Sequence, residues 1–190
     1  MAGRGEGPEF IEALARGLDV LRAFGADRPR MTRAEVAAAS DLARPTARRI
    51  LLTLTELGYV RSDGNVFSLT PRVLELGMAY VGSLGLWEVA RQHMRDLVAI
   101  TGESSSISQL DGSDIVYVAR VAVPKIIALR VEVGTRFPAV VCSQGKVLLA
   151  ALDPDEVPGV LALPSRSGIE PYRTYRPAEV EPMLREVRAR

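Results

Sequence analysis

Apolar residues recur every three or four positions in the first part of the chain, the spacing that places them on one face of a helix. The predicted helix ends before Gly25, and its apolar positions are Ile11, Leu14, Leu18, Leu21 and Phe24. Thr32, three residues before Glu35, forms a capping-box pattern that predicts a short helix to about Ala39. Pro45 suits a first helical position and Gly58 the residue after a helix end, which predicts a third helix over Pro45–Leu57.

The pattern then changes to short runs with strand character. Tyr59–Ser62 and Val66–Leu69 flank an Asp63-Gly64 pair, which is a strong hairpin signal. Three helices followed by a hairpin is the order of a winged helix-turn-helix. We assign this domain to residues 10–70, after a disordered lead at residues 1–9, and interpret the apolar helix predicted over Pro71–Ser83 as a linker.

Residues 84–190 predict a second domain that mixes helices and strands, so the fold class is α+β. A helix over Leu86–Ile100 precedes three β-branched-rich runs that indicate an antiparallel meander. These runs are Ser104–Leu110, Ile115–Val121 and Ile126–Val133. A loop over Gly134–Pro138, a helix over Val140–Leu152, a second loop and a last helix from Pro177 to about Val187 complete the prediction.

Positive charge is concentrated in one segment of an otherwise balanced chain. The whole chain has a formal net charge of +1, whereas Arg28–Arg61 contains seven arginines and three acidic residues, a net charge of +4. A local excess on the second helix of a helix-turn-helix favours contact with phosphates and base edges of double-stranded DNA. The expected DNA-binding residues are Thr32, Arg33, Arg44, Pro45, Thr46, Arg48, Arg49, Thr53, Arg61 and Asn65. The alternative is that these arginines only form the solvated face of a small helical domain.

Few residues suit metal or cofactor chemistry. The chain has one cysteine, Cys142, and one histidine, His93, so we expect neither a disulfide framework nor a metal cluster, and no cofactor. His93 and Trp87 are interpreted as packing or surface residues. Met1–Glu9 lacks the apolar segment of a signal peptide, and no apolar run approaches the ~20 residues that span a bilayer. We therefore expect a cytoplasmic protein without a membrane partner.

Several segments resemble the IclR-type bacterial transcription regulators. The resemblance covers Ile11–Leu152 and extends more loosely to the end of the chain; it rests on Ala15–Leu18, on Arg44–Leu51 with Leu57–Val60, and on Gly145–Ala150. Within that family, Phe10–Leu18 and Gly134–Ala139 are most similar to regulators of the β-ketoadipate pathway for aromatic acids. The resemblance implies a homodimer or homotetramer that binds operator DNA, with a C-terminal GAF-like α/β domain for a small organic acid.

The ligand is expected at the start of the helix predicted over Val140–Leu152. Unpaired backbone N–H groups and the helix dipole favour a carboxylate there. The resemblance implies backbone donors at Ser143 and Gln144 beside Gly145, with Arg136 and Phe137 in the pocket wall. Alternatively, Ser143 is an ordinary first-turn residue and Cys142 a small buried apolar one. The resemblance also implies that the family's last strands and C-terminal helix lie beyond Arg190, so we expect an incomplete effector domain.

Two other function classes compete with a regulator. Ser143-Gln144-Gly145-Lys146 matches the Ser-x-x-Lys motif of penicillin-recognising enzymes, but Ser113-Asp114 is not followed by Asn and neither lysine precedes Thr-Gly, so we expect no enzyme. A winged helix that binds protein instead of DNA remains an alternative, and a weak salt dependence of binding would favour it. The apolar linker positions are a candidate self-association surface, and the alternative is that they pack on their own domain: Leu74, Leu76, Gly77, Tyr80 and Val81.

Overall fold

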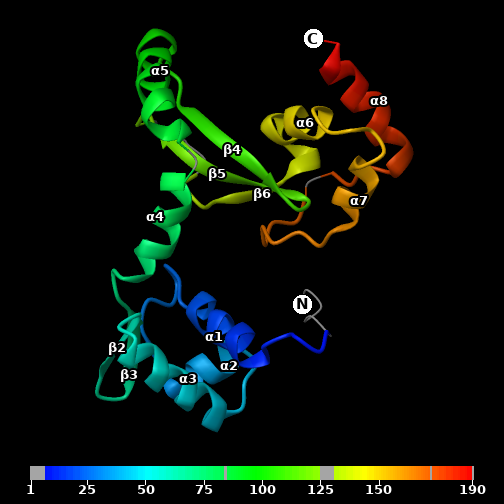
Figure 1. The fold of residues 1–190 in the computed structure, drawn as a ribbon. Helices are drawn as coiled ribbons and strands as arrows, with labels where there is room; N and C mark the ends of the chain where they lie inside the picture. The colour runs from blue at the N-terminus through cyan, green and yellow to red at the C-terminus, as the bar shows by residue number, and fades with distance from the viewer. Residues whose placement is uncertain (1–6, 84, 125–130, 172, 190) are drawn as a thin grey trace. The chain divides into compact units, whose positions relative to one another are not determined.

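The computed structural model describes residues 7–83, 85–124, 131–171 and 173–189. The chain divides into two compact units, Met1–Ser83 and Leu84–Arg190 (Figure 1). Most of the predicted disordered lead, residues 1–6, lies outside the described residues, and so does the side chain of Trp87. His93 is exposed.

Unit 1 is a winged helix-turn-helix, which confirms the predicted fold. Its helices are α1 (Glu12–Ala23), α2 (Arg33–Ala39), α3 (Arg44–Glu56) and α4 (Val73–Ser83). The wing consists of β2 (Val60–Asp63) and β3 (Val66–Leu69), joined by a tight turn in which Gly64 has a positive φ of 62°. A two-residue strand that was not predicted, β1 (Met31–Thr32), adds to β3, so the antiparallel sheet has the order β1-β3-β2.

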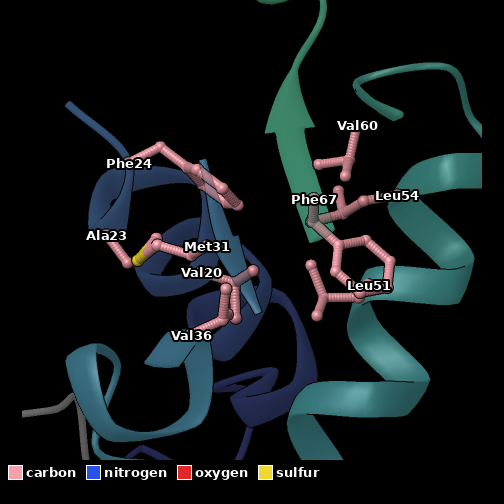
Figure 2. Packing of buried hydrophobic residues seen from close by; sticks show 9 residues of the cluster. All are labelled: Val20, Ala23, Phe24, Met31, Val36, Leu51, Leu54, Val60 and Phe67. Atoms are coloured by element: carbon pink, nitrogen blue, oxygen red, sulfur yellow. The ribbon is translucent and has the colours of Figure 1, made fainter. Parts of the chain in front are cut away.

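The core of unit 1 joins the helices to the wing. Figure 2 shows Phe67 of β3 beside Leu51 and Leu54 of α3, with Val60 of β2 close by. Val20 of α1 and Val36 of α2 are fully buried on the other side of this cluster. Full burial of one such side chain stabilises a fold by roughly 1.5–3 kcal/mol. The core therefore fixes α3 relative to the wing.

The apolar stripe predicted on the first helix is mostly not part of this core. Phe24 is buried, but Ile11 and Leu14 are 66% and 62% exposed, and Leu18 is exposed as well. The helix packs instead through Val20 and the small Ala23, which occupy the side that faces the core. The periodicity predicted the helix correctly, whereas Ile11, Leu14 and Leu18 of its apolar stripe remain on the surface.

Unit 2 contains a three-stranded antiparallel sheet and four α-helices within its described residues. The elements are α5 (Leu86–Thr101), β4 (Ser105–Asp111), β5 (Asp114–Val121), β6 (Arg136–Pro138), the 3-10 helix η1 (Ala139–Val141), α6 (Ser143–Ala150), α7 (Val157–Ala162) and α8 (Pro177–Arg188). The strand order is β4-β5-β6. Helices α6, α7 and α8 pack together around Leu149, Val157 and Leu184 (Figure 1).

Three boundaries in unit 2 differ from the sequence prediction. Of the strand expected over Ile126–Val133, residues 126–130 lie outside the described part, and residues 131–133 are irregular. The third strand is instead β6, within the segment expected to be a loop, because Ile115 and Val116 of β5 pair with Phe137 and Arg136. Helix α7 lies in the second predicted loop.

The helix predicted from Val140 begins only at Ser143. Ala139–Val141 forms a separate 3-10 turn, and the extended backbone of Cys142 separates it from α6. This break lets α6 fold back closely onto η1. A Cβ atom on Gly145 would overlap the carbonyl oxygen of Ala139, so a residue without a side chain is required there.

Candidate nucleic-acid interface and ligand site

Three arginines of α3 form an exposed cationic group on unit 1. Arg44, Arg48 and Arg49 are all exposed, while Ala47 and Leu51 of the same helix are fully buried. Within the described residues, none of the three guanidinium groups has an acidic partner within ion-pair distance. Their charge is therefore available to an outside anion.

The predicted contact residues of α3 do not all lie on one face of the helix. Some point outward, and others lie on the side that borders α1. At 100° per residue, Pro45 and Arg49 point away from the buried positions. Thr46 is half-buried and, with Thr53, borders a groove toward α1. Leu52 on the outward face is 49% exposed, although it is absent from the contacts predicted from the sequence. The sequence feature that could have predicted Leu52 as an exposed residue is its position one turn after Arg48 and Arg49.

Thr32 is engaged in the local structure of unit 1. Its Oγ1 accepts a hydrogen bond from the Glu35 backbone N–H at 3.3 Å, and its own N–H donates to the Glu35 carboxylate at 2.7 Å. These two bonds form the predicted capping box. The Thr32 N–H and the Thr32 hydroxyl, which donates to the Glu35 carboxylate at 2.8 Å, lower the pKa of Glu35, and the backbone donor has the larger effect. Thr32 thus begins α2 and leaves Arg33 at its first position.

Three arginines, one just before β1, one on α2 and one on β2, contact polar groups of the wing. Arg33 Nε donates to Asn65 Oδ1 at 3.1 Å, and Arg61 Nε donates to Ser68 Oγ at 3.0 Å. Arg30, which is not among the predicted contacts, pairs with Asp63 at 3.0 Å. This pair was not visible in the sequence because its members are 33 positions apart.

The candidate ligand site in unit 2 lies at the start of α6. Cys142 is the N-cap residue but makes no side-chain cap, so the first-turn N–H groups lack a side-chain acceptor from the cap position. Gln144 donates from Nε2 to the Ser106 carbonyl of β4 at 3.3 Å, and its buried Oε1 has no hydrogen-bond partner in the described structure. Burial raises the pKa of the Cys142 thiol.

Ser143 and Gln144 point in different directions. Ser143 is exposed and, with Lys146, lines a groove of about 710 Å³ between α6 and α8. Gln144 reaches the sheet, and Gly145 packs against η1. Lys146 Nζ lies 3.4 Å from the Tyr175 hydroxyl and 5.5 Å from the centre of its ring. Ser143 and Lys146 thus share one groove, and the Lys146 ammonium is also engaged by Tyr175.

Arg136 is held by acidic residues of the β4–β5 hairpin. Its guanidinium pairs with Asp111 and lies 4.0 Å from the carboxylate of the buried Asp114. The Arg136 hydrogen bond lowers the pKa of Asp111. Its neighbour Phe137 packs edge-on against Tyr117, with ring centres 6.0 Å apart. The sequence placed both residues in a pocket wall; the structure gives Arg136 a cross-strand ionic contact and Phe137 an aromatic one.

An apolar groove of about 710 Å³ lies on unit 1 between α1, α3 and α4. Its walls include Leu14 and Leu18 of α1, Ile50 and Leu57 of α3, and Leu76 of α4. No residue of α4 is buried, and Leu74, Leu76 and Met78 are each more than half exposed. Helix α4 and the stripe of α1 therefore both expose apolar side chains on unit 1.

The fold defines a winged-helix module followed by a second unit, which is built from a three-stranded antiparallel sheet and helices. Residues 13–64 match the IclR helix-turn-helix domain, and residues 78–190 match the C-terminal domain of bacterial transcriptional regulators of the IclR type. The chain therefore belongs to the IclR family of transcriptional regulators, as the sequence indicated.

Relatives of the chain include regulators of aromatic-acid genes. The Pca regulon regulatory protein of Pseudomonas putida is 40% identical over 147 residues, which cover 77% of this chain and 50% of that protein. The p-hydroxybenzoate hydroxylase transcriptional activator of Acinetobacter baylyi is 42% identical over 150 residues, covering 76% and 55%. The chain thus spans about half the length of these curated relatives.

Solved structures of similar proteins share the fold. One from Rhodococcus sp. RHA1, assigned as a transcriptional regulator, has a TM-score of 0.76 and 47% identity, covering 95% of this chain and 72% of that one. An IclR homologue from Microbacterium hydrocarbonoxydans in complex with 4-hydroxybenzoate has a TM-score of 0.74 and 25% identity, covering 94% and 72%. These relatives are regulators, in agreement with the expectation that the chain is not an enzyme. None of the helices in the described part of the chain has the length and apolar character needed to cross a membrane.

Proposed function

We propose that this chain is a sequence-specific, DNA-binding transcriptional regulator. The observation that carries the proposal is the set of exposed α3 arginines without acidic partners, on a helix that the core fixes relative to the wing. A recognition helix in this geometry presents its first turns to the major groove, where arginine can donate to both acceptors of guanine. Arg44, Arg48 and Arg49 are the proposed contacts from α3.

The other predicted contacts have narrower proposed roles. Pro45 and Thr46 shape the start of α3, and Thr53, whose Oγ1 donates to the Arg49 carbonyl at 3.1 Å, lies one turn further from the DNA. Thr32 positions Arg33 by capping α2. Arg61 on the wing is a phosphate contact.

A second copy of the chain is the proposed occupant of the apolar groove on unit 1. A two-fold pair would place two recognition helices in successive major grooves about 34 Å apart on a pseudo-palindromic operator. The exposed apolar groups of α1 and α4, Leu14, Leu18, Leu74 and Leu76 among them, supply the contact surface. A homodimer or homotetramer is therefore the expected functional form, acting in the cytoplasm where its DNA is found.

DNA binding is tested by the salt dependence of duplex affinity. The dissociation constant of the wild-type chain should rise steeply with salt, because each neutralised phosphate releases counterions. Arg49→Ala should weaken binding roughly fivefold at low salt, with an unchanged melting temperature. Arg185→Ala, an equal loss of charge on an exposed residue of α8, is the control and should have a smaller effect. A salt-insensitive complex would favour a protein partner for the winged helix.

The proposed effector is a small organic acid, with an aromatic acid favoured. The names of the Pca and p-hydroxybenzoate regulators, and the 4-hydroxybenzoate bound to the Microbacterium homologue, support this class. At the start of α6, backbone N–H groups and the amide of Gln144 are suited to a carboxylate and to a polar substituent. Regulation then requires that the acid bind two arrangements of the protein with different affinity.

Effector binding is tested by a thermal-shift titration with 4-hydroxybenzoate and protocatechuate. Gln144→Met should abolish the shift and leave DNA affinity unchanged, because unit 1 is not altered. Ser143→Trp should also reduce the shift if the acid approaches the exposed first turn of α6, and Ser143→Ala is the small control at that position. A wild-type-sized shift in Gln144→Met would contradict the proposed placement of the acid.

A further inference from the structure

Two polar contacts join the wing turn to the segment around β1. The pairing of Met31 with Phe67 and of Thr32 with Val66 brings Arg30 and Arg33 to the wing turn. Arg30 Nη2 lies 3.0 Å from Asp63 Oδ2, and Arg33 Nε donates to Asn65 Oδ1 at 3.1 Å. Two arginines are thus held by two side chains of nearly the same shape, one of which is charged and the other neutral.

This difference changes the charge that each pair presents to solvent. The pair of Arg30 and Asp63 carries no net charge, and its side chains are 60% and 82% exposed. The pair of Arg33 and Asn65 keeps the full guanidinium charge. Because Asn65 engages only Nε of Arg33, the end of the guanidinium that carries one N–H of each terminal nitrogen points away from that contact. Such an end can donate to two oxygens of one phosphate.

We propose that Asn65 is a positioning residue that holds Arg33 for a DNA phosphate, and that Asp63 limits the wing's affinity for DNA by neutralising Arg30. This inference rests on the proposed function and refines it, because it assigns Asn65 to the orientation of Arg33 and not to direct DNA contact. An exposed ion pair contributes little to the stability of a fold, so the main effect of the pair of Arg30 and Asp63 is on local charge. The carboxylate of Glu35, two positions after Arg33 in the sequence, accepts hydrogen bonds from Thr32.

Two nearly isosteric substitutions should have opposite effects. Asn65→Asp neutralises Arg33 and should weaken the binding of a random-sequence 30-base-pair duplex roughly fivefold at low salt, with a salt slope smaller by about one. Asp63→Asn releases Arg30 and should strengthen binding by a similar factor, with a steeper slope. Asp155→Asn in unit 2 removes the same charge as Asp63→Asn and serves as the control for net charge.

A double-mutant cycle separates positioning from direct contact. Asn65→Ala should weaken binding roughly two- to threefold, consistent with losing the fixed orientation of one phosphate contact. In an Arg33→Ala background the same substitution should have no effect. Fluorescence anisotropy gives the affinities, and thermal melts confirm that all variants fold.

Three results would overturn the proposal. The first is that Asn65→Asp and Asp63→Asn shift affinity in the same direction or not at all. The second is that Asp155→Asn matches Asp63→Asn, and the third is that Asn65→Ala acts equally with and without Arg33. A wild-type chain that binds DNA with a steep salt dependence while these variants leave it unchanged would retain the regulator function and refute only this inference. A wild-type chain without salt-dependent binding would refute both.

Discussion

Arg48 of α3 and Arg136 of β6 are the same residue type in opposite electrostatic surroundings. Arg48 is exposed and has no acidic partner among the described residues, whereas Arg136 contacts Asp111 and lies 4.0 Å from the buried carboxylate of Asp114. The carboxylates that the fold brings near a guanidinium thus decide its role. The charge of Arg48 in unit 1 can therefore interact with a binding partner, whereas the charge of Arg136 in unit 2 stabilises the contact between strands.

Substituting alanine for a helix glycine should give the largest difference in stability between the two units. Gly145→Ala should destabilise unit 2 by about 3 kcal/mol, because the new Cβ overlaps the Ala139 carbonyl and α6 must move away from η1. Gly17→Ala in α1 has open space around the new methyl group and should stabilise unit 1 by about 0.5–1 kcal/mol. Urea unfolding followed by circular dichroism measures both. Equal effects would show that α6 does not depend on this close approach.

Replacing Arg136 or Arg48 with an uncharged residue compares directly how much each arginine stabilises its unit. Arg136→Met should destabilise unit 2 by about 2 kcal/mol, since it leaves Asp114, 1% exposed, without its cation. Arg48→Met should change the stability of unit 1 by less than about 0.5 kcal/mol. Chemical denaturation of both variants tests this order. If Arg48→Met were the more destabilising variant, the proposed division between binding and structural arginines would be wrong.

Lowering the pH should weaken the contact between Arg136 and Asp111, with a smaller loss of stability than Arg136→Met causes. The pKa of Asp111 is lowered by its hydrogen bond from Arg136, so the folded state favours the carboxylate. Its stabilising effect is present above the ordinary pKa of 3.8 and is lost as the pH falls through the lower folded value. Wild type should therefore lose more stability than Asp111→Asn between about pH 6 and about pH 2. The difference should stay below about 1 kcal/mol because Asp111 is half exposed.

The sequence predicted best those features that a few neighbouring residues determine. The capping box of Thr32 and Glu35 and the wing turn at Gly64 are local, and both are present in the structure. Strand β1 has only two residues and exists through its pairing with β3, so its own sequence has no signal for it. Likewise, Val140 and Val141 continue an apolar pattern, and only the packing of Gly145 on Ala139 separates them from α6.

The candidate sites show the same limit. The cationic segment of α3 and its exposed face follow from composition and helical period, and the arginines do lie on the surface. The acids that neutralise Arg30 and Arg136 are 33 and 25 positions away in the sequence, so their pairing depends on strand register. For this reason the number of arginines could be predicted from the sequence, but which of them are free of an acidic partner could not.

The carboxylate of Asp114 also determines how a distant loop behaves. It accepts hydrogen bonds from the Ser165 hydroxyl at 2.7 Å and from the backbone N–H of Arg166 at 2.6 Å, about fifty positions further along the chain. These contacts fix part of the segment between α7 and α8, whose described residues form neither helix nor strand. A protease that cleaves after arginine should therefore cut slowly after Arg166, even though that residue is exposed, because the backbone must first detach from Asp114.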